Sequence, residues 1–369
     1  ATGSERYAFN AADWHQLIAR TSLTHLLRDI QRRDIGPQNA AAFLGAKDVY
    51  PEIGMNTTND GQFIFTGKAV VPGVYTREAL EHDVKPVLDQ VPEVVSGLPL
   101  AENEKIRFMN HIQSVVDTYA RQYENAYRRY YRAFDITAPT PEALKFALAQ
   151  LQLPASPLLT LLEVIRENTT VENDANPFFQ PIRHRLQSFA FVRRILVREQ
   201  DGLSELDKYQ ALVKQMETML LDEAPYAPGE EAQPGDALKR KSSPLGRLFL
   251  SVYLEEEGSY YDLIQKWLQS VGVDPVWHFP FLDPVYQAYR QGMAEVEALI
   301  EREWSAMEND YVDPVLTRFP FDKTAEEEAT PEEALRLLAP QGEFKNNFIQ
   351  YILPFCKKSG DDLIVRDFP

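Results

Sequence analysis

Hydrophobic residues recur at spacings of three and four along most of the chain, the periodicity of helices that bury one face. The longest such pattern extends from Glu102 to Phe134, where no glycine or proline interrupts it. Its apolar and aromatic positions are Met109, Ile112, Val116, Tyr119, Tyr123, Tyr127, Tyr130 and Phe134. We therefore predict a mainly α, multi-helix fold with at most a short β element near 62–75, and we expect 102–134 to be its longest helix.

A hydroxyl residue followed by proline begins several of the predicted helices. The hydroxyl caps the helix N-terminus, and proline fits the first helical position. The pairs are Thr140-Pro141, Ser156-Pro157 and Ser243-Pro244. Thr76 is expected to cap another helix, which follows a turn at 71–75 and ends near Val95. Similar patterns predict helices at 11–33, 177–198, 203–222, 244–257, 259–270 and 283–313, and a short strand at 63–65.

Residues 224–243 interrupt this periodicity. They contain three prolines, two glycines, a glutamate pair and a Lys-Arg-Lys cluster, a composition that offers no apolar face to bury. A chain of 369 residues is also long for a single core. We therefore expect an N-terminal helical domain at 1–223, an exposed and protease-sensitive linker at 224–243, and a C-terminal helical domain at 244–369.

The segment from Trp304 to Phe355 carries the most specific pattern in the chain. Trp304, Tyr311 and their neighbours at helical spacing form one helix face. Pro320 disfavours helical dihedral angles at the preceding residue, so we expect the helix to end at the corner Arg318-Phe319-Pro320-Phe321. We expect Trp304 and both phenylalanines of the corner to pack against the body of the domain.

A short helix is predicted after this corner. Thr330-Pro331-Glu332-Glu333 combines a capping hydroxyl, a proline at the first helical position and a glutamate three residues after the cap. Leu335 and Leu338 are its expected apolar stripe. A second, phenylalanine-rich helix is expected from Phe344 to Pro354.

This arrangement resembles the periplasmic region of the IcmF/TssM family, the inner-membrane scaffold proteins of type VI secretion systems. The corner 318–321 is similar to the family's Arg-Tyr-Pro-Phe, with Phe319 in place of tyrosine, and 339–342 is a variant of its Gly-Pro-Gly-Gly turn. Two earlier segments are similar to the family as well. They are Pro72-Gly73 with Tyr75-Thr76-Arg77, and the block 123–170 that contains Ser156-Pro157.

The resemblance implies a non-catalytic periplasmic scaffold whose parent protein is anchored in the bacterial inner membrane. Its implied partners are a TssJ-like outer-membrane lipoprotein, a TssL-like inner-membrane protein and further copies of itself. In the family a β-rich domain follows the corner. The alternatives are a related component of a type IV secretion system, a helical module that binds the cell wall (peptidoglycan) and, third, a hydrolase.

The net charge limits the classes of partner that the chain can bind, and the cysteine content excludes a disulfide within it. The formal net charge of −17 argues against nucleic acid, because phosphate binding depends on clustered cations. The tyrosines and arginines of 119–132 are accordingly interpreted as a packed tyrosine stripe with arginine stems beside it. Cys356 is the single cysteine, so it forms no disulfide within the chain. We expect neither a signal peptide nor a membrane-spanning segment in this sequence.

Catalytic and cofactor motifs are incomplete. The glycines around 61–68 have the wrong spacing for a phosphate loop, and Ala69 stands where a magnesium-binding hydroxyl belongs. The six histidines show no metal-ligand spacing. We therefore expect no enzyme, cofactor or metal site. The residues we single out as structural or interaction candidates are Trp304, Tyr311, Arg318, Phe319, Pro320, Phe321, Pro72, Gly73, Tyr75, Thr76, Arg77, Ser156 and Pro157.

Overall fold

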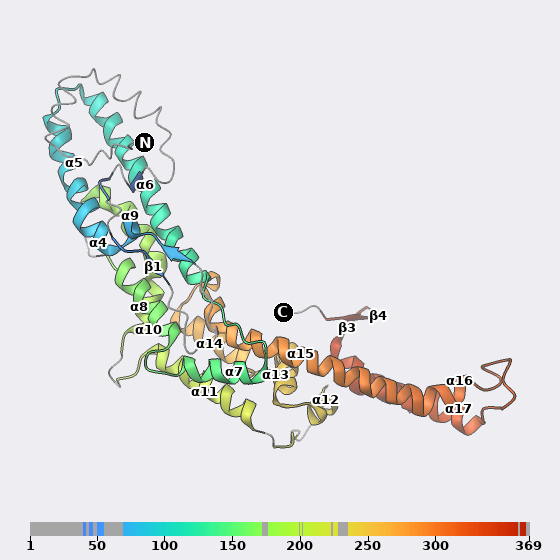
Figure 1. Cartoon of the computed structure of the whole chain (residues 1–369). Coiled ribbons are helices and arrows are strands. Elements are labelled where there is room, and N and C mark those ends of the chain that lie inside the picture. Colours follow the sequence, from blue (N-terminus) through green and yellow to red (C-terminus); the bar gives the residue numbers. More distant parts are fainter. Residues whose placement is uncertain are drawn as a thin grey trace, which may run out of the picture. The chain divides into compact units, whose positions relative to one another are not determined.

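The computed structural model describes residues 40–41, 44–46, 50–54, 69–171, 176–198, 200, 202–222, 224–227, 235–360 and 362–366 (Figure 1). Over these residues the chain is mainly helical, as predicted, with two short antiparallel strand pairs. It forms two compact units that alternate along the sequence. Unit 1 comprises 1–135 and 154–207, and unit 2 comprises 136–153 and 208–369. The helix predicted at 11–33, the strand predicted at 63–65 and the glycines of 61–67 lie outside the described residues.

Unit 1 is built around α6 (Glu102–Arg132), the predicted long helix. Its tyrosine stripe is fully buried, which confirms the interpretation as a core. The rings of Tyr123 and Tyr127 stack with centroids 5.4 Å apart, and Tyr119 meets Tyr123 edge-on at 5.9 Å. Large buried rings in these geometries contribute strongly to a core. The buried tyrosines are Tyr119, Tyr123, Tyr127, Tyr130 and Tyr131.

The described part of unit 1 starts with a strand pair and a capped helix. Ile53 lies opposite Val71 in the pair. The Thr76 hydroxyl accepts a hydrogen bond from the Ala79 N–H at 3.2 Å, as predicted for the cap. A π-helical turn, η2, then interrupts the expected helix. The elements are β1 (Ile53–Gly54), β2 (Val70–Val71), η1 (Gly73–Tyr75), α4 (Arg77–Ala79), η2 (Leu80–Val84) and α5 (Lys85–Gly97).

The second half of unit 1 contains α8 (Pro157–Thr169), capped by Ser156, and then a series of short helices where one helix was predicted at 177–198. The break at η4 is explained by packing. It brings Phe189 onto Tyr127 at 6.3 Å and Phe191 onto Tyr131 at 5.9 Å, so both rings cover α6. The series is η3 (Pro177–Phe179), α9 (Gln180–Leu186), η4 (Gln187–Phe189) and α10 (Ala190–Leu196).

Unit 2 is organised around α15 (Phe279–Met307), which packs along α13 (Pro244–Tyr253). The two backbones approach closely at Gly292, where a Cβ atom would lie 2.3 Å from the carbonyl oxygen of Leu245. At the start of α15, Phe281 packs on Tyr209 and Trp267 with centroids 5.3 and 5.2 Å apart. The other helices of this core are α7 (Pro141–Leu151), most of α11 (Glu205–Leu221), α14 (Tyr260–Val271) and η5 (Pro275–Trp277).

Part of the expected linker is folded. Within 224–243 the structure describes 224–227 and 235–243, and α12 (Asp236–Lys241) lies in the second part. Lys239 is only 5% exposed; it pairs with Glu256 and lies 5.5 Å from the ring centre of Tyr226. The expectation of a fully exposed stretch is therefore wrong for 236–239, because the charged side chains there find partners within the fold. The compact units are also divided at different positions than the expected domains, whose boundary stays a prediction.

The chain after α15 continues through a π-helical turn and short helices to a hairpin. Thr330 and Glu333 form the predicted capping box. The expected stripe is wrong, because Leu335 and Leu338 are 64% and 58% exposed while Leu337 is the buried leucine of α17. The hairpin was not predicted. These elements are η6 (Glu308–Val312), α16 (Asp313–Leu316), α17 (Pro331–Leu338), α18 (Glu343–Asn347), η7 (Phe348–Ile352), η8 (Leu353–Phe355), β3 (Cys356–Ser359) and β4 (Asp362–Val365).

None of the helices in the described ranges combines the length and the apolar character that crossing a bilayer requires.

Candidate interaction surface

The candidate residues of unit 1 at positions 72–77 hold the turn before α4 in place. Gly73 lies so close to Tyr50 that a Cβ atom would approach the Tyr50 carbonyl oxygen to 2.0 Å. The Tyr75 hydroxyl donates to the Gln122 side chain at 3.0 Å, and the Arg77 N–H donates to Asn168 Oδ1 at 3.0 Å. Residues Pro72 to Arg77 therefore tie the turn to α6 and to the end of α8, which is a structural role.

Two buried tyrosines complete this connection. The hydroxyl of Tyr119 donates to the Val74 carbonyl at 2.9 Å, and that of Tyr123 donates to the Asn168 carbonyl at 2.7 Å. Burial raises the pKa of both phenols well above their usual value, so both remain protonated donors. Ser156 is fully buried and caps α8 through its hydroxyl, which accepts from the Leu159 N–H at 3.1 Å, with Pro157 at the first helical position. Gly73, Tyr75, Thr76 and Ser156 are thus buried, whereas the Arg77 side chain is partly exposed and pairs with Glu81.

Backbone hydrogen bonds fix the corner 318–321 in unit 2, and its aromatic side chains are exposed. The Phe319 N–H donates to the Glu327 carbonyl at 2.9 Å, and the Ala329 N–H donates to the Phe319 carbonyl at 2.8 Å. The guanidinium of Arg318 pairs with Glu333 at 3.1 Å. Phe319 and Phe321 are both 44% exposed. The expectation that they pack onto the domain is therefore wrong, because the backbone bonds that fix the corner turn both rings outward.

The helix before the corner is also fixed by its candidates. Trp304 is half-buried and meets Phe344 edge-on, with ring centroids 5.8 Å apart. Arg336 lies over the Tyr311 ring at 4.9 Å. These contacts fasten α18 to the end of α15 and α17 to η6. Trp304, Tyr311 and Arg318 are thus supporting residues, and the two phenylalanines with Pro320 form the exposed part of the set.

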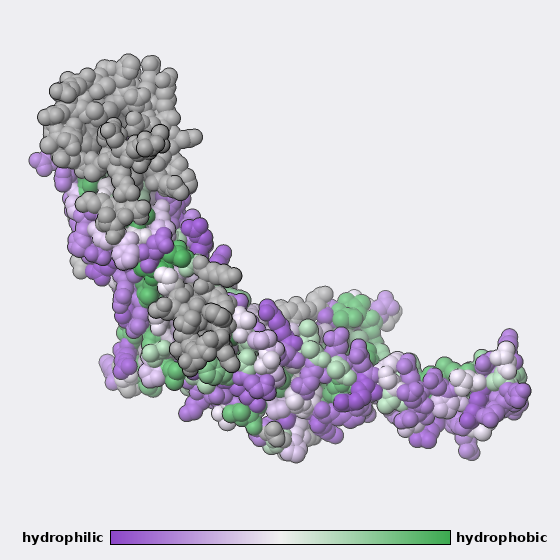
Figure 2. All heavy atoms as spheres, in the orientation of Figure 1, coloured by the Kyte–Doolittle hydropathy of each residue, from purple (hydrophilic) through white to green (hydrophobic). Residues whose placement is uncertain are grey.

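The surroundings of the corner are acidic and in part apolar. Leu316, Leu335 and Leu338 are exposed on α16 and α17. Hydrophilic residues cover most of this region in Figure 2, with apolar residues between them. Exposed aromatic and leucine side chains that are surrounded by charged residues are typical of surfaces that bind another protein. The acidic residues next to the corner include Glu326, Glu327 and Glu328.

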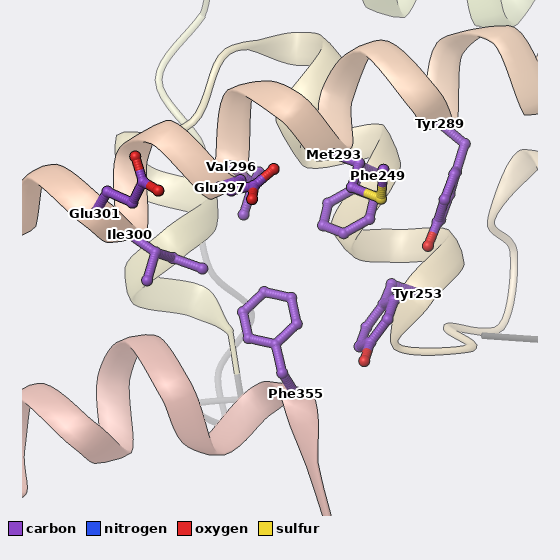
Figure 3. A pocket seen from close by; sticks show the side chains of 9 residues that line it. All are labelled: Phe249, Tyr253, Tyr289, Met293, Val296, Glu297, Ile300, Glu301 and Phe355. Atoms are coloured by element: carbon purple, nitrogen blue, oxygen red, sulfur yellow. The ribbon is translucent and has the colours of Figure 1, made fainter. Parts of the chain in front are cut away.

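Unit 2 also has a groove that the sequence analysis did not identify. It has a volume of about 570 Å³ and lies between α13, α15 and η8. Phe249 and Tyr253 enter it from α13, and Phe355 enters from η8, as Figure 3 shows. One face of α15 forms the long wall, with Tyr289, Met293, Val296, Glu297, Ile300 and Glu301. The three-and-four spacing of these six positions was visible in the sequence, but the packing of Phe355 opposite them was not.

The described ranges contain no cluster of metal-ligating side chains. Histidine, cysteine, aspartate and glutamate side chains do not gather there in a group of three suited to a metal ion. Asp262 accepts hydrogen bonds from the Gly258 N–H at 2.8 Å and pairs with Lys266 at 2.9 Å, which lowers the pKa of its carboxyl. His184 is exposed, and burial lowers the pKa of His111.

No protein-family model matches the chain, and no curated protein matches it. A solved structure described as "Type VI secretion system membrane core complex" contains a chain with a similar fold. The TM-score is 0.55 at 18% sequence identity, and the match covers 89% of this chain. The matched part spans 64% of the length of the other chain. At this identity the likeness establishes a shared fold.

Proposed function

We propose that this chain is a non-catalytic scaffold segment in the membrane complex of a type VI secretion system, of the IcmF/TssM kind. The observation that carries the proposal is the fold shared with a chain of such a complex over 89% of the sequence. The segments that resemble the family, above all the corner 318–321, support it from the sequence side. The proposed location is the periplasm, with the parent protein anchored in the inner membrane.

The proposed role is to hold partners at fixed positions. Helices are the stiffest elements available for this role, and each residue adds about 1.5 Å of length. Helix α6 has 31 residues and α15 has 29, so each spans roughly 45 Å. Both are fixed within their own unit by buried aromatic side chains. The proposed partners are an outer-membrane lipoprotein, an inner-membrane subunit and further copies of the parent protein.

The exposed corner provides a direct test. In bacteria that carry the parent gene, replacing Phe319 and Phe321 with serine should reduce co-purification of the other membrane-complex subunits several-fold. The melting temperature of the purified chain should change little, because both rings are 44% exposed.

Phe146→Ser is the matched control, since Phe146 is a similarly exposed phenylalanine on α7. It should leave co-purification unchanged. If the corner variant recovers every subunit in normal amounts, the corner does not bind partners. If none of the other membrane-complex subunits co-purifies with the unmodified parent protein, the proposed function itself is wrong.

A further inference from the structure

The groove between α13, α15 and η8 has a rigid apolar floor. Phe249, Tyr289 and Val296 are buried beneath it. The rings of Phe249 and Tyr289 have centroids 4.8 Å apart, and the rings of Phe355 and Tyr253 pack with centroids 5.1 Å apart. Close packing of α13 on α15 at Gly292 keeps this floor in place. A volume of about 570 Å³ is left above it.

The rim of the groove is apolar and accessible. Met293 is 44% exposed, and Ile300 and Phe355 are half-buried. Figure 3 shows Phe355 directed from η8 toward α15, with Tyr289 and Ile300 of α15 extending toward the same side. From Tyr289 to Glu301 the wall is thirteen residues long, which corresponds to a rise of about 18 Å. This length accommodates about three turns of a second helix.

Two carboxylates stand at one end of the groove without a counter-charge. Glu297 and Glu301 are exposed and lie one helical turn apart, a spacing at which like charges repel. Within the described ranges neither forms an ion pair or a hydrogen bond. Their neighbours on α15 differ, because Glu295 accepts hydrogen bonds from Ser243 and Glu303 pairs with Lys241. The groove therefore combines apolar space with unneutralised negative charge.

We propose that this groove docks a basic amphipathic segment of another protein. Leucine or aromatic side chains of the segment fill the space over Phe249 and Phe355, and lysine or arginine side chains reach Glu297 and Glu301. This is the helix-in-groove mode of recognition, in which a few apolar anchors at helical spacing supply the affinity and charges select the partner. The inference rests on the proposed function in one respect, since it adds the chemistry of one partner site to the scaffold.

The test uses the purified chain and two synthetic 18-residue amphipathic helices with the same leucine and phenylalanine face. One peptide carries lysines on its flanks and the other carries glutamates. Fluorescence anisotropy at 100 mM salt should detect binding of the lysine peptide and none of the glutamate peptide. Met293→Ser should weaken binding of the lysine peptide several-fold, because it removes an apolar contact at the rim. The double variant Glu297→Lys/Glu301→Lys should weaken it at least tenfold and gain binding of the glutamate peptide.

The control is Glu326→Lys/Glu328→Lys, which changes the net charge by the same amount at exposed positions next to the corner. It should keep the affinity for the lysine peptide within twofold. Equal effects of the two charge-reversed variants would mean diffuse attraction to an acidic protein and would overturn the proposal. Concentration-dependent self-association that Met293→Ser abolishes would make a second copy the occupant and would also overturn it. The peptide experiment tests only the groove, whereas co-purification and secretion test the scaffold role. If the lysine peptide does not bind, the docking proposal is wrong and the proposed function still stands on its own tests.

Discussion

The carboxylate of Asp283 accepts a hydrogen bond from the backbone N–H of Ile136 at 2.6 Å, although the two residues are 147 positions apart. Asp283 is only 1% exposed, and its other oxygen accepts from the Gln287 side chain at 3.1 Å. Gln291, two helical turns after Asp283, donates to the Ala138 carbonyl at 2.6 Å. Helix α15 thus captures the segment 136–138 that leads into α7.

Replacing Asp283 with alanine should destabilise unit 2 by about 2–4 kcal/mol. The buried N–H of Ile136 would lose its acceptor, and a small cavity would form. Urea denaturation followed by circular dichroism measures the loss. Asp310→Ala is the control, because Asp310 is exposed and should change stability by less than about 0.5 kcal/mol. Equal stability of the two variants would contradict the assigned role of Asp283.

The position of α7 in unit 2 gives a prediction about the expected domain boundary. If the chain is expressed as separate fragments 1–223 and 244–369, the first fragment carries α7 away from α15. We expect the fragments to co-elute in size-exclusion chromatography when they are co-expressed, because α7 and α15 belong to the same core. Two fragments that elute separately, each fully folded, would instead support independent domains at 1–223 and 244–369.

Gly73→Ala should lower the stability of unit 1 by about 1–3 kcal/mol. A Cβ atom there would lie 2.0 Å from the Tyr50 carbonyl oxygen, so backbone must move to make room. Gly54→Ala provides the comparison, because a Cβ atom at Gly54 meets nothing within 4 Å. Differential scanning calorimetry of both variants tests this. The close approach would be refuted if Gly73→Ala melted at the temperature of Gly54→Ala.

We predict that Asp207, at the start of α11, makes a pH-dependent contribution to the free energy of unfolding. The Ser204 backbone N–H, at 2.6 Å, and the Ser204 hydroxyl, at 2.7 Å, donate to its carboxylate and lower the pKa of Asp207. A lowered pKa in the folded state stabilises the fold above the unfolded pKa of about 4, and this stabilisation is lost as the pH falls through the folded value.

Asp207→Ala should therefore lower the free energy of unfolding by about 0.5–1 kcal/mol at pH 7. The loss should be no larger because the carboxylate is partly exposed and solvent screens its interactions. The difference from the unmodified chain should shrink below pH 4. Urea titrations at pH 7 and pH 2.5 measure both values. A difference that grows toward low pH would have the wrong sign for this account.

The helices were predictable where local signals agree. The Thr76, Thr140, Ser156, Ser243 and Thr330 caps all form as the sequence indicates, since a capping bond depends on neighbouring residues only. The tyrosine stripe of α6 was predictable for the same reason. Breaks such as η4 were not, because they depend on which aromatic rings cover α6 in three dimensions.

The surface was harder to predict than the core. Periodicity marks Leu335 and Leu338 as apolar, but it does not say whether another element covers them, and in the structure they are exposed. The orientation of Phe319 and Phe321 depends on backbone hydrogen bonds to residues 327 and 329, which no sequence pattern contains. The groove requires Phe355 to lie beside α13 and α15, a long-range contact that spacing alone does not reveal.

The most direct test of the scaffold account is secretion of a type VI effector from bacteria that carry altered versions of the parent gene. Deleting the residues of this chain, while keeping the rest of the protein, should abolish secretion and assembly of the membrane complex. Bacteria that carry the single variants His111→Gln, His184→Ala or Asp262→Asn should secrete normally as long as the chain folds. Each of these variants removes a titratable group that could serve in catalysis. Loss of secretion in one of these variants, with folding and complex assembly intact, would contradict a passive scaffold and favour an enzyme.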